Sequence, residues 1–367
     1  MSEYKCIPLG DNVEEMFIGP FGSSLKNECF VDEDESYCMV YEQKHAIQKT
    51  MDVETRYVNE QKYNELKRFN VRGGDIIVSC RGTIGETFIV PDDAPFGIMH
   101  PSIMKIRLKE GVYDRYYFNL LLKSRLKKHE AEANGSGIKM AISATELGKE
   151  LFPVPTMEEQ LEITDIISRI SSVIEKRKQE LSALDNLIKA RFVELFGDPI
   201  INSKHLETKD LKDVLILKAG DFTAASDIAD APSESNPYPC YGGNGIRGYV
   251  SEFNQEGEYS LVGRQGALSG NVQFASGKFK NTEHALLVTP IVAMNAIWLN
   301  QLLLNLDLKR YQTGAAQPGL SVKNLQEIQI LCVPIDEQDK FADFVKQVDK
   351  SKFANMLIPF ETLKDCC

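Results

Sequence analysis

The chain has 367 residues, of which 43% are apolar and 26% are charged, a composition typical of soluble globular proteins. At roughly 150 residues per domain, this length predicts two domains and an additional segment. The formal net charge of -11 weakens a nucleic-acid-binding hypothesis without excluding it, because phosphate binding depends on local clusters of Lys and Arg. The apolar runs are far shorter than the roughly 20 residues that cross a bilayer, which argues against a transmembrane helix and a membrane partner.

The N-terminal sequence MSEYKCIPLGDNVEE carries acids where a secretory signal needs an apolar stretch, so we expect a cytoplasmic protein. The eight cysteines form no C-x-x-C pair, and two of them, Cys366 and Cys367, are adjacent at the end of the sequence. In the cytoplasm such cysteines are expected to remain free thiols.

Residues 1–155 are expected to form a first domain of short strands and helices. Strand-like sequences begin at Gly74 (GDIIVSC) and at Glu86 (ETFIV), with Gly and Pro at their boundaries. A helical pattern follows near residues 116–128 and carries a basic run that contains Lys123, Arg125, Lys127 and Lys128. This run is either a solvated helix face or a local basic patch.

A long helix is predicted next, within residues 156–198. Thr156 and Glu159 have the spacing of a capping box, in which a hydroxyl and a carboxylate satisfy each other's backbone donors. Apolar side chains then recur at heptad spacing until Gly197 and Pro199. A helix of about 40 residues is about 60 Å long and cannot cover its own apolar stripe, so it needs a partner helix.

Residues 199–334 are expected to form a second domain, with strand-like sequences GYV, YSLVG, NVQFA and HALLV and a helical pattern near residues 297–311. Residues 335–367 begin with a shorter helix that places Phe341, Phe344, Val345 and Val348 on one face. Antiparallel pairing of the two helices as a coiled coil is the interpretation we favour, and two ordinary core helices are the alternative. The fold class is therefore α+β, with two domains separated by long helices.

The two halves of the chain repeat one plan. Ser143 matches Ser321, Leu147 matches Leu325 and Glu159-Gln160 match Glu337-Gln338, all at an offset of 178 residues. Upstream, VSCRGTIG ending at Gly85 is similar to VGRQGALSG ending at Gly270. Such a repeat predicts two copies of a domain-plus-helix unit that are related by a pseudo-twofold axis.

The order of these motifs resembles the DNA-specificity subunit of type I restriction-modification systems. The resemblance rests on RGTIG, GSGIK (residues 135–139), PVPTMEEQ, a heptad helix ending in LFGD and a second VP-x-x-EQ sequence. It extends to GPFGSSLK (residues 19–26) and, in the second half, to YPCYGGNGIRGYV (residues 238–250), GRQGALSG and TEHALLV. The chain departs from the family at its C-terminus, where the second helical region is short.

The resemblance implies a non-catalytic subunit. Two target-recognition domains would each read one half of a split double-stranded DNA sequence, and the paired helices would bind two modification subunits. S-adenosylmethionine would be bound by those methyltransferase partners, and ATP and Mg²⁺ by partner subunits that include a separate restriction and translocase subunit. This chain would bind none of these cofactors.

The sequence itself offers little support for catalysis. It has no G-x-x-x-x-G-K-[ST] motif, and Asn236-Pro237-Tyr238 lacks the second proline of the N-P-P-Y tetrapeptide of DNA amino-methyltransferases. The five histidines are too dispersed to indicate a metal site. A stand-alone methyltransferase is therefore disfavoured, and the alternative function is a coiled-coil protein-interaction scaffold without sequence-specific DNA binding.

Candidate DNA-reading residues are polar side chains on Gly-flanked loops, whose chemistry suits base edges and phosphates. They are Lys26, Ser79, Arg81, Thr83 and Lys139 in the first half, and Asn244, Arg247, Arg264, Gln265 and His284 in the second. Extra apolar positions beside the heptad stripe are candidates for contact with modification subunits, namely Ile166, Val173 and Leu187.

Overall fold

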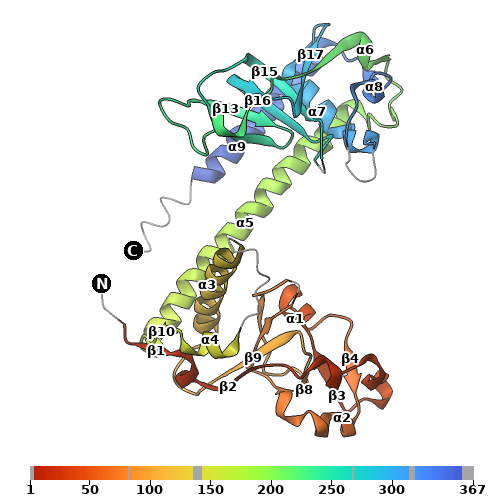
Figure 1. Cartoon of the computed structure of the whole chain (residues 1–367). Coiled ribbons are helices and arrows are strands. Elements are labelled where there is room, and N and C mark those ends of the chain that lie inside the picture. The colour runs from red at the N-terminus through yellow and green to blue at the C-terminus, as the bar shows by residue number, and fades with distance from the viewer. Residues whose placement is uncertain (1–3, 82, 135–142, 267, 314–318, 358–367) are drawn as a thin grey trace. The chain divides into compact units, whose positions relative to one another are not determined.

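The structure is a computed structural model that describes residues 4–81, 83–134, 143–266, 268–313 and 319–357. The chain divides into two compact units, unit 1 (Met1–Val173) and unit 2 (Ile174–Cys367). They are coloured from red to yellow and from green to blue in Figure 1. The division falls within one continuous helix, α5 (Met157–Phe196), whose two ends therefore belong to different units.

Unit 1 is built on two four-stranded sheets. One has the strand order β2-β9-β6-β7 and is antiparallel throughout, and the other has the order β4-β3-β8-β5 with a parallel β3–β8 pair. The strands are β2 (Val13–Ile18), β3 (Cys38–Tyr41), β4 (Arg56–Val58), β5 (Asn70–Val71), β6 (Ile76–Ser79), β7 (Thr87–Ile89), β8 (Gly97–Met99) and β9 (Ile103–Leu108). The predicted strands at GDIIVSC and ETFIV are confirmed as β6 and β7.

The helices of unit 1 flank these sheets. They are α1 (Gln43–Gln48), α2 (Glu60–Glu65), α3 (Arg115–Asn134) and α4 (Ala144–Lys149), followed by the first half of α5. The helix predicted near residues 116–128 is confirmed within α3. Its apolar face, including Phe118 and Leu122, packs with Ile76 and Ile106 of the first sheet, so α3 is fixed by burial of that face.

Unit 2 is built on one six-stranded sheet of order β12-β17-β15-β16-β13-β14. Its strands are β12 (Leu215–Ala219), β13 (Tyr238–Gly242), β14 (Gly245–Val250), β15 (Gln255–Gly263), β16 (Val272–Asn281) and β17 (Ala285–Pro290). The helices are α6 (Leu211–Val214), α7 (Ala296–Asn305), α8 (Val322–Leu325) and α9 (Ile335–Leu357). All four predicted strand sequences and the helix predicted near residues 297–311 are confirmed, the last as α7 and a short 3₁₀ turn.

The repeat seen in the sequence is present in the fold. The sheet order β2-β9-β6-β7 of unit 1 has its counterpart in β12-β17-β15-β16 of unit 2. Each unit is also closed by a short antiparallel pair, β1 (Cys6–Pro8) with β10 (Leu151–Pro153) and β11 (Thr208–Asp210) with β18 (Gln329–Leu331). The side chains of Ser143 and Ser321 cap the N-termini of α4 and α8, so the matched serines are helix N-caps in both units.

The long helix begins and ends where the sequence predicts. The Thr156 hydroxyl accepts from the Glu159 N–H at 3.3 Å, and the Glu159 carboxylate accepts from the Thr156 N–H at 2.8 Å. The helix stops before Gly197, which has a φ of 79° that a residue with a Cβ adopts only with strain. The predicted capping box and the length of 40 residues are confirmed.

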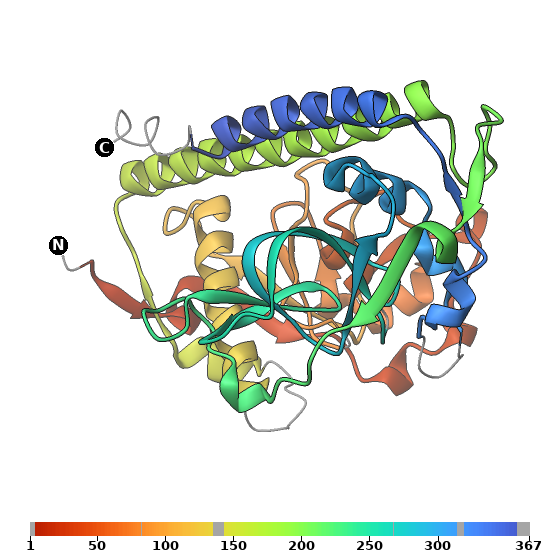
Figure 2. The same cartoon turned by 90° about the horizontal axis from the view of Figure 1, so that it is seen from above.

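Within unit 2, α9 runs alongside the C-terminal part of α5 in the opposite direction (Figure 2). Phe341, near the start of α9, packs on Phe192 and Phe196 with ring centroids 5.5 and 5.6 Å away. Further along α9, Lys352 forms an ion pair at 2.7 Å with Asp185, which precedes those two residues in α5. The contact buries Phe341, Val345 and Val348 as predicted, and leaves Phe344 half-buried.

Candidate nucleic-acid interface

The two glycine-flanked loops identified in the sequence are equivalent hairpin ends. In unit 1 the loop after β6 is closed by a bond from the Gly85 N–H to the Ser79 carbonyl at 2.9 Å. In unit 2 the loop after β15 is closed by a bond from the Gly270 N–H to the Gly263 carbonyl at 2.8 Å. Both closing glycines have positive φ, 87° and 82°, so the backbone explains why glycine recurs there.

These loops present different side chains to solvent in the two units. Arg81 and Thr83 are exposed in the first loop, and Arg264 and Gln265 are exposed in the second. Ser79 is a correction to the predicted set, because it is fully buried and its hydroxyl accepts from the Glu86 N–H at 3.0 Å. Its role is to hold the loop, since a buried hydroxyl that is already bonded does not face a base edge.

The structure brings four predicted residues of unit 2 together from three separate segments. The Arg264 N–H donates to the His284 carbonyl at 3.0 Å, which joins the loop to the turn before β17. A Cβ on Gly243 would lie 3.2 Å from that same carbonyl oxygen, so the β13–β14 turn that carries Asn244 approaches closely. The side chain of His284 lies 3.2 Å from the Gln265 amide oxygen, and Asn244 accepts from Asn271 at 3.1 Å.

Arg247 lies on the same β13–β14 hairpin. Its aliphatic stem passes over Gly242, where a Cβ would lie only 2.5 Å from the Arg247 Cδ. Glycine at position 242 therefore leaves room for this arginine to cross the hairpin, and Arg247 is exposed. The polar surface formed by Asn244, Arg247, Arg264, Gln265 and His284 is hereafter the unit 2 cluster.

Of the other predicted residues of unit 1, only Lys26 has a described position, and it lies apart from the loop. Lys26 is exposed on the turn after Leu25, where its ammonium lies 3.8 Å from the Glu28 carboxylate. Lys139 lies outside the residues that the structure describes. Arg81, by contrast, lines a cavity of about 390 Å³ together with Phe21 and Arg68.

A cluster of lysines that the site prediction omitted lies at the base of the unit 1 loop. Lys49, Lys123 and Lys127 line a cavity of about 250 Å³ with Gly85 and Glu86, and we call these three the lysine cluster. Lys49 pairs with Glu86 at 3.2 Å. Burial lowers the pKa of Lys123, and the charges of Lys49 and Lys127 lower it further against the opposing effect of Glu86. Three cations around one carboxylate leave an excess of positive charge, which suits a phosphate.

The basic run in α3 could have indicated part of this cluster. Lys123 and Lys127 are four residues apart and so share one helix face. Arg125, from the same run, points elsewhere: it donates to the Leu151 carbonyl at 3.3 Å and lies 5.8 Å from the Phe152 ring centroid. Lys49 ends α1 with a left-handed backbone, and no local pattern places it beside α3.

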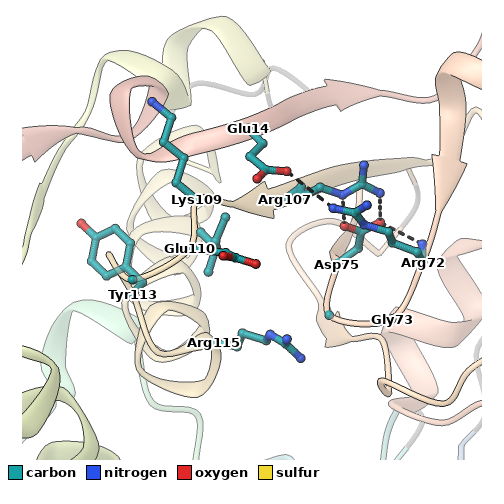
Figure 3. A pocket seen from close by; sticks show the side chains of 12 residues that line it. Glu14, Arg72, Gly73, Asp75, Arg107, Lys109, Glu110, Tyr113 and Arg115 are labelled. Carbon is teal, nitrogen blue, oxygen red and sulfur yellow. Dashed lines mark hydrogen bonds and ion pairs between the residues drawn. The ribbon is translucent and has the colours of Figure 1, made fainter.

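A second pocket of unit 1, of about 270 Å³, is lined by charged side chains, and its arginines pair with carboxylates of the same unit (Figure 3). The Arg107 guanidinium donates to both oxygens of Asp75 at 2.7 Å, and a further donation reaches Glu15 at 2.9 Å. Across the pocket mouth, Arg72 lies 3.6 Å from the Glu14 carboxylate. Because these cations are already paired with carboxylates of the same fold, they provide little free positive charge for a ligand.

The described residues hold no group of three or more His, Cys, Asp or Glu side chains that could bind a metal ion. Across these same ranges, the helices are too short or too polar to cross a bilayer.

The three predicted partner-contact residues of α5 are all exposed, Ile166 at 40%, Val173 at 46% and Leu187 at 47%. They follow one another at multiples of seven residues and so lie on one face of the helix.

A family model for the type I restriction modification DNA specificity domain matches the chain twice, over residues 21–185 and 203–356. The chain belongs to this family. The type I restriction enzyme EcoprrI specificity subunit of Escherichia coli is 30% identical over 320 residues, which cover 81% of this chain and 77% of that protein. A putative type I restriction enzyme specificity subunit of Haemophilus influenzae is 27% identical over 157 residues, which cover 42% of this chain and 39% of that protein.

Solved structures support the same fold. The S subunit of a type I restriction-modification system from M. genitalium has a TM-score of 0.57 and 16% identity, and the match covers 100% of this chain and 96% of that one. A chain from a structural study of complex assembly in the type I R-M system has a TM-score of 0.52, also at 16% identity, with 100% and 95% coverage. As a type I specificity subunit, the protein is non-catalytic and carries two recognition domains. The alternative of an interaction scaffold is not favoured.

Proposed function

We propose that each unit reads one half of a split double-stranded DNA target through the loops described above. The observation that carries this proposal is the equivalence of the two hairpin loops, one with Arg81 and Thr83 and the other with Arg264 and Gln265. Arg pairs with guanine and Gln with adenine through two hydrogen bonds each. Because both loops are closed by the same kind of hydrogen bond but differ in side chains, the two halves of the target are expected to differ in sequence.

In unit 2, the reading surface is the unit 2 cluster. It combines amide, imidazole and guanidinium groups from three segments. The backbone bond from Arg264 to His284 and the side-chain contact between His284 and Gln265 hold these segments together before DNA binds. Preorganised polar groups lose less entropy on binding. In unit 1 the lysine cluster contacts the phosphate backbone beside the base-reading loop, which positions Arg81 without reading sequence itself.

Helices α5 and α9 are proposed to hold the two units and to bind the partner subunits. We infer that α5 and α9 pair as an antiparallel coiled coil and that a pseudo-twofold axis relates the two domain-plus-helix units. The antiparallel contacts of Phe341 and Lys352 with α5 support this pairing. The exposed apolar face with Ile166, Val173 and Leu187 then contacts two modification subunits, because such a stripe is costly to leave in water.

The partners supply the chemistry. We infer that the modification subunits bind S-adenosylmethionine and that ATP and Mg²⁺ serve partner subunits, among them a restriction and translocase subunit. The specificity subunit directs both activities to the target in the cytoplasm.

Gel shifts with and without the cognate modification subunit test this function. The target is first identified by mapping methylated adenines in a host that carries both subunits. The complex is expected to retain a matched duplex far more strongly than one with either half scrambled, and the chain alone to bind weakly. Equal retention of matched and scrambled duplexes by the complex would contradict the proposal.

A further inference from the structure

Each unit presents one strongly exposed phenylalanine at an equivalent position. Phe21 follows β2 and is 86% exposed, and Phe222 follows β12 and is 79% exposed. Among the residues that the structure describes, these are the two most exposed large apolar side chains. Both occur in a Gly-x-Phe sequence, GPF at Gly19 and GDF at Gly220.

The backbone shows that the two sequences are structural equivalents. A Cβ on Gly19 would lie 2.3 Å from the His100 carbonyl oxygen, and one on Gly220 would lie 2.0 Å from the Asn281 carbonyl oxygen. Glycine is therefore required at both points by the same close approach to a neighbouring turn. In both units the exposed phenylalanine lies two residues after this glycine.

Both segments start beside the base-reading loops. In unit 1, the Gly19 N–H donates to the Ile103 carbonyl at 2.9 Å. The carbonyl of the adjacent residue, Ser102, accepts from the N–H of Cys80 in the loop at 2.8 Å. In unit 2, the Gly220 N–H donates at 3.2 Å to Thr282, which lies in the same turn as His284. Each phenylalanine is therefore placed at the edge of the surface proposed to read DNA.

Hydrogen bonds hold the turns that carry the two exposed rings. The Phe21 carbonyl accepts from the Ser24 N–H at 2.8 Å. The Asp221 carboxylate, next to Phe222, accepts from Asn254 at 2.8 Å and lies 3.7 Å from the Lys280 ammonium. An aromatic ring this exposed adds little to the stability of the fold, and burying it against a partner is favourable.

The surroundings of Phe21 indicate the chemistry of that partner. Arg68 and Arg81 line the cavity beside it, together with Phe69 and Pro101. The Arg68 guanidinium also lies 5.5 Å from the ring centroid of Phe17. Aromatic faces flanked by guanidinium groups suit a nucleobase that has left the duplex stack while its phosphates are neutralised.

We propose that Phe21 and Phe222 each stack on an unstacked base at the edge of a half-site, and so stabilise a local distortion of the duplex. This inference rests on the proposed function, because it needs the two loops to bind DNA. Apolar side chains that insert at base steps are a known means of deforming a duplex. The repetition of the feature gives each half-site its own aromatic contact.

The test uses the complex of this chain with its modification subunits and duplexes that carry 2-aminopurine at successive half-site positions. With the wild-type chain, the fluorescence of one position in each half should change on binding. Phe21→Ala should abolish the change in one half and Phe222→Ala in the other. Each variant should weaken binding by about 5- to 150-fold, from base–aromatic stacking of about 1 to 3 kcal/mol.

Substitutions of graded chemistry separate stacking from simple apolar contact. Phe21→Trp should retain the affinity and the fluorescence change, whereas Phe21→Leu should lose most of both. A mismatch at the reporting position should restore much of the binding of Phe21→Ala, because the base is then already unstacked. Tyr116→Ala, which removes a 63% exposed ring on α3, is the matched control and should bind DNA as the wild type does.

Three results would overturn the inference. Unchanged DNA affinity and fluorescence in both alanine variants would show that the rings do not touch DNA. Loss of assembly with the modification subunits before DNA is added would show that the rings contact protein. If the wild-type complex did not bind its mapped target, the proposed function would fail together with this inference.

Discussion

Gln160 and Gln338, 178 residues apart, hold their helices to the rest of their units in the same way. The Gln160 side chain accepts from the Asp114 N–H at 2.8 Å and donates to the Pro155 carbonyl at 2.9 Å. Gln338 accepts from the Asn295 N–H at 2.9 Å and donates to the Val333 carbonyl at 2.8 Å. Both glutamines are buried. Each joins the start of a long helix to the residue just before an earlier helix, Asp114 before α3 and Asn295 before α7.

These contacts predict that Gln160→Leu and Gln338→Leu each destabilise their own unit. Either change removes the side-chain partner of one backbone N–H and of at least one backbone carbonyl, at a cost of about 2 to 4 kcal/mol in the free energy of unfolding. Chemical denaturation followed by circular dichroism measures the loss. Gln179→Leu, at an exposed position of α5, is the control and should shift stability by less than about 0.5 kcal/mol. Equal effects at all three positions would refute the anchoring role.

The aromatic contact between α5 and α9 predicts a second stability effect. Phe192 is fully buried against Phe196, Trp298 and Phe341, so Phe192→Ala should cost about 3 to 5 kcal/mol. Because this ring supports α9, limited proteolysis should also cut α9 faster in the variant. Val193→Ala, at the neighbouring half-exposed position, should leave both properties nearly unchanged. A Phe192→Ala protein with wild-type stability would contradict the packing described for unit 2.

The stability of unit 1 is predicted to fall on acidification, beginning near pH 6.5. Burial lowers the pKa of His45 below its ordinary value near 6.5. The unfolded chain therefore takes up a proton at a higher pH than the folded chain does, and this favours unfolding as the pH falls below 6.5. Burial alone would raise the pKa of Glu42, but Arg56 and Lys44 hold it below its ordinary 4.5, so a further loss follows below that pH.

Thermal melts of wild type and His45→Gln between pH 7.5 and 4.5 measure this effect. Glutamine can keep the bond that the His45 ring makes with the Glu42 N–H at 3.1 Å, and it does not titrate in this range. The variant should show a shallower fall in Tm between pH 6.5 and 5. His100, whose pKa is also lowered mainly by burial, should leave part of the slope in place. Identical slopes for both proteins would contradict the assignment to His45.

Salt dependence should distinguish the lysine cluster from the base-reading loop. Replacing Lys49, Lys123 and Lys127 by Gln should weaken binding to all duplexes alike and reduce the salt slope by about 1 for each phosphate that is no longer neutralised. Arg81→Ala should instead cost about 1 to 3 kcal/mol at one position of one half-site. Lys149→Gln, an exposed lysine paired with Glu146, should change neither property. A sequence-dependent effect of the lysine replacements would contradict their assignment to phosphates.

The sequence predicts those parts of the fold that are set by local patterns. The capping box at Thr156, the stop at Gly197 and the matched glutamines are all visible at fixed spacing. The prediction for Ser79 is wrong although this serine lies within the right motif. Its burial depends on the return of the chain into β7, which brings the Glu86 N–H within hydrogen-bonding distance of the Ser79 hydroxyl. Spacing alone does not report which side chain of a loop faces inwards.

Long-range pairing determines the parts that local patterns do not reveal. The unit 2 cluster forms because β13 pairs in parallel with β16, which brings the Asn244 turn beside the segment that carries His284. Lys49 reaches Lys123 from a different helix for a similar reason. The equivalence of Phe21 and Phe222 is likewise a property of the sheets, since the sequences around them share little beyond Gly-x-Phe.

The most direct test of the account is adenine methylation mapped across a genome whose only type I system contains this chain, compared among wild type, Arg81→Ala and Gln265→Ala. The wild type should methylate one target with two separated halves. Arg81→Ala should relax the sequence of one half only, and Gln265→Ala that of the other half only, with the spacer unchanged. Relaxation of the same half by both variants, or an unaltered target in both, would contradict the assignment of one half-site to each unit.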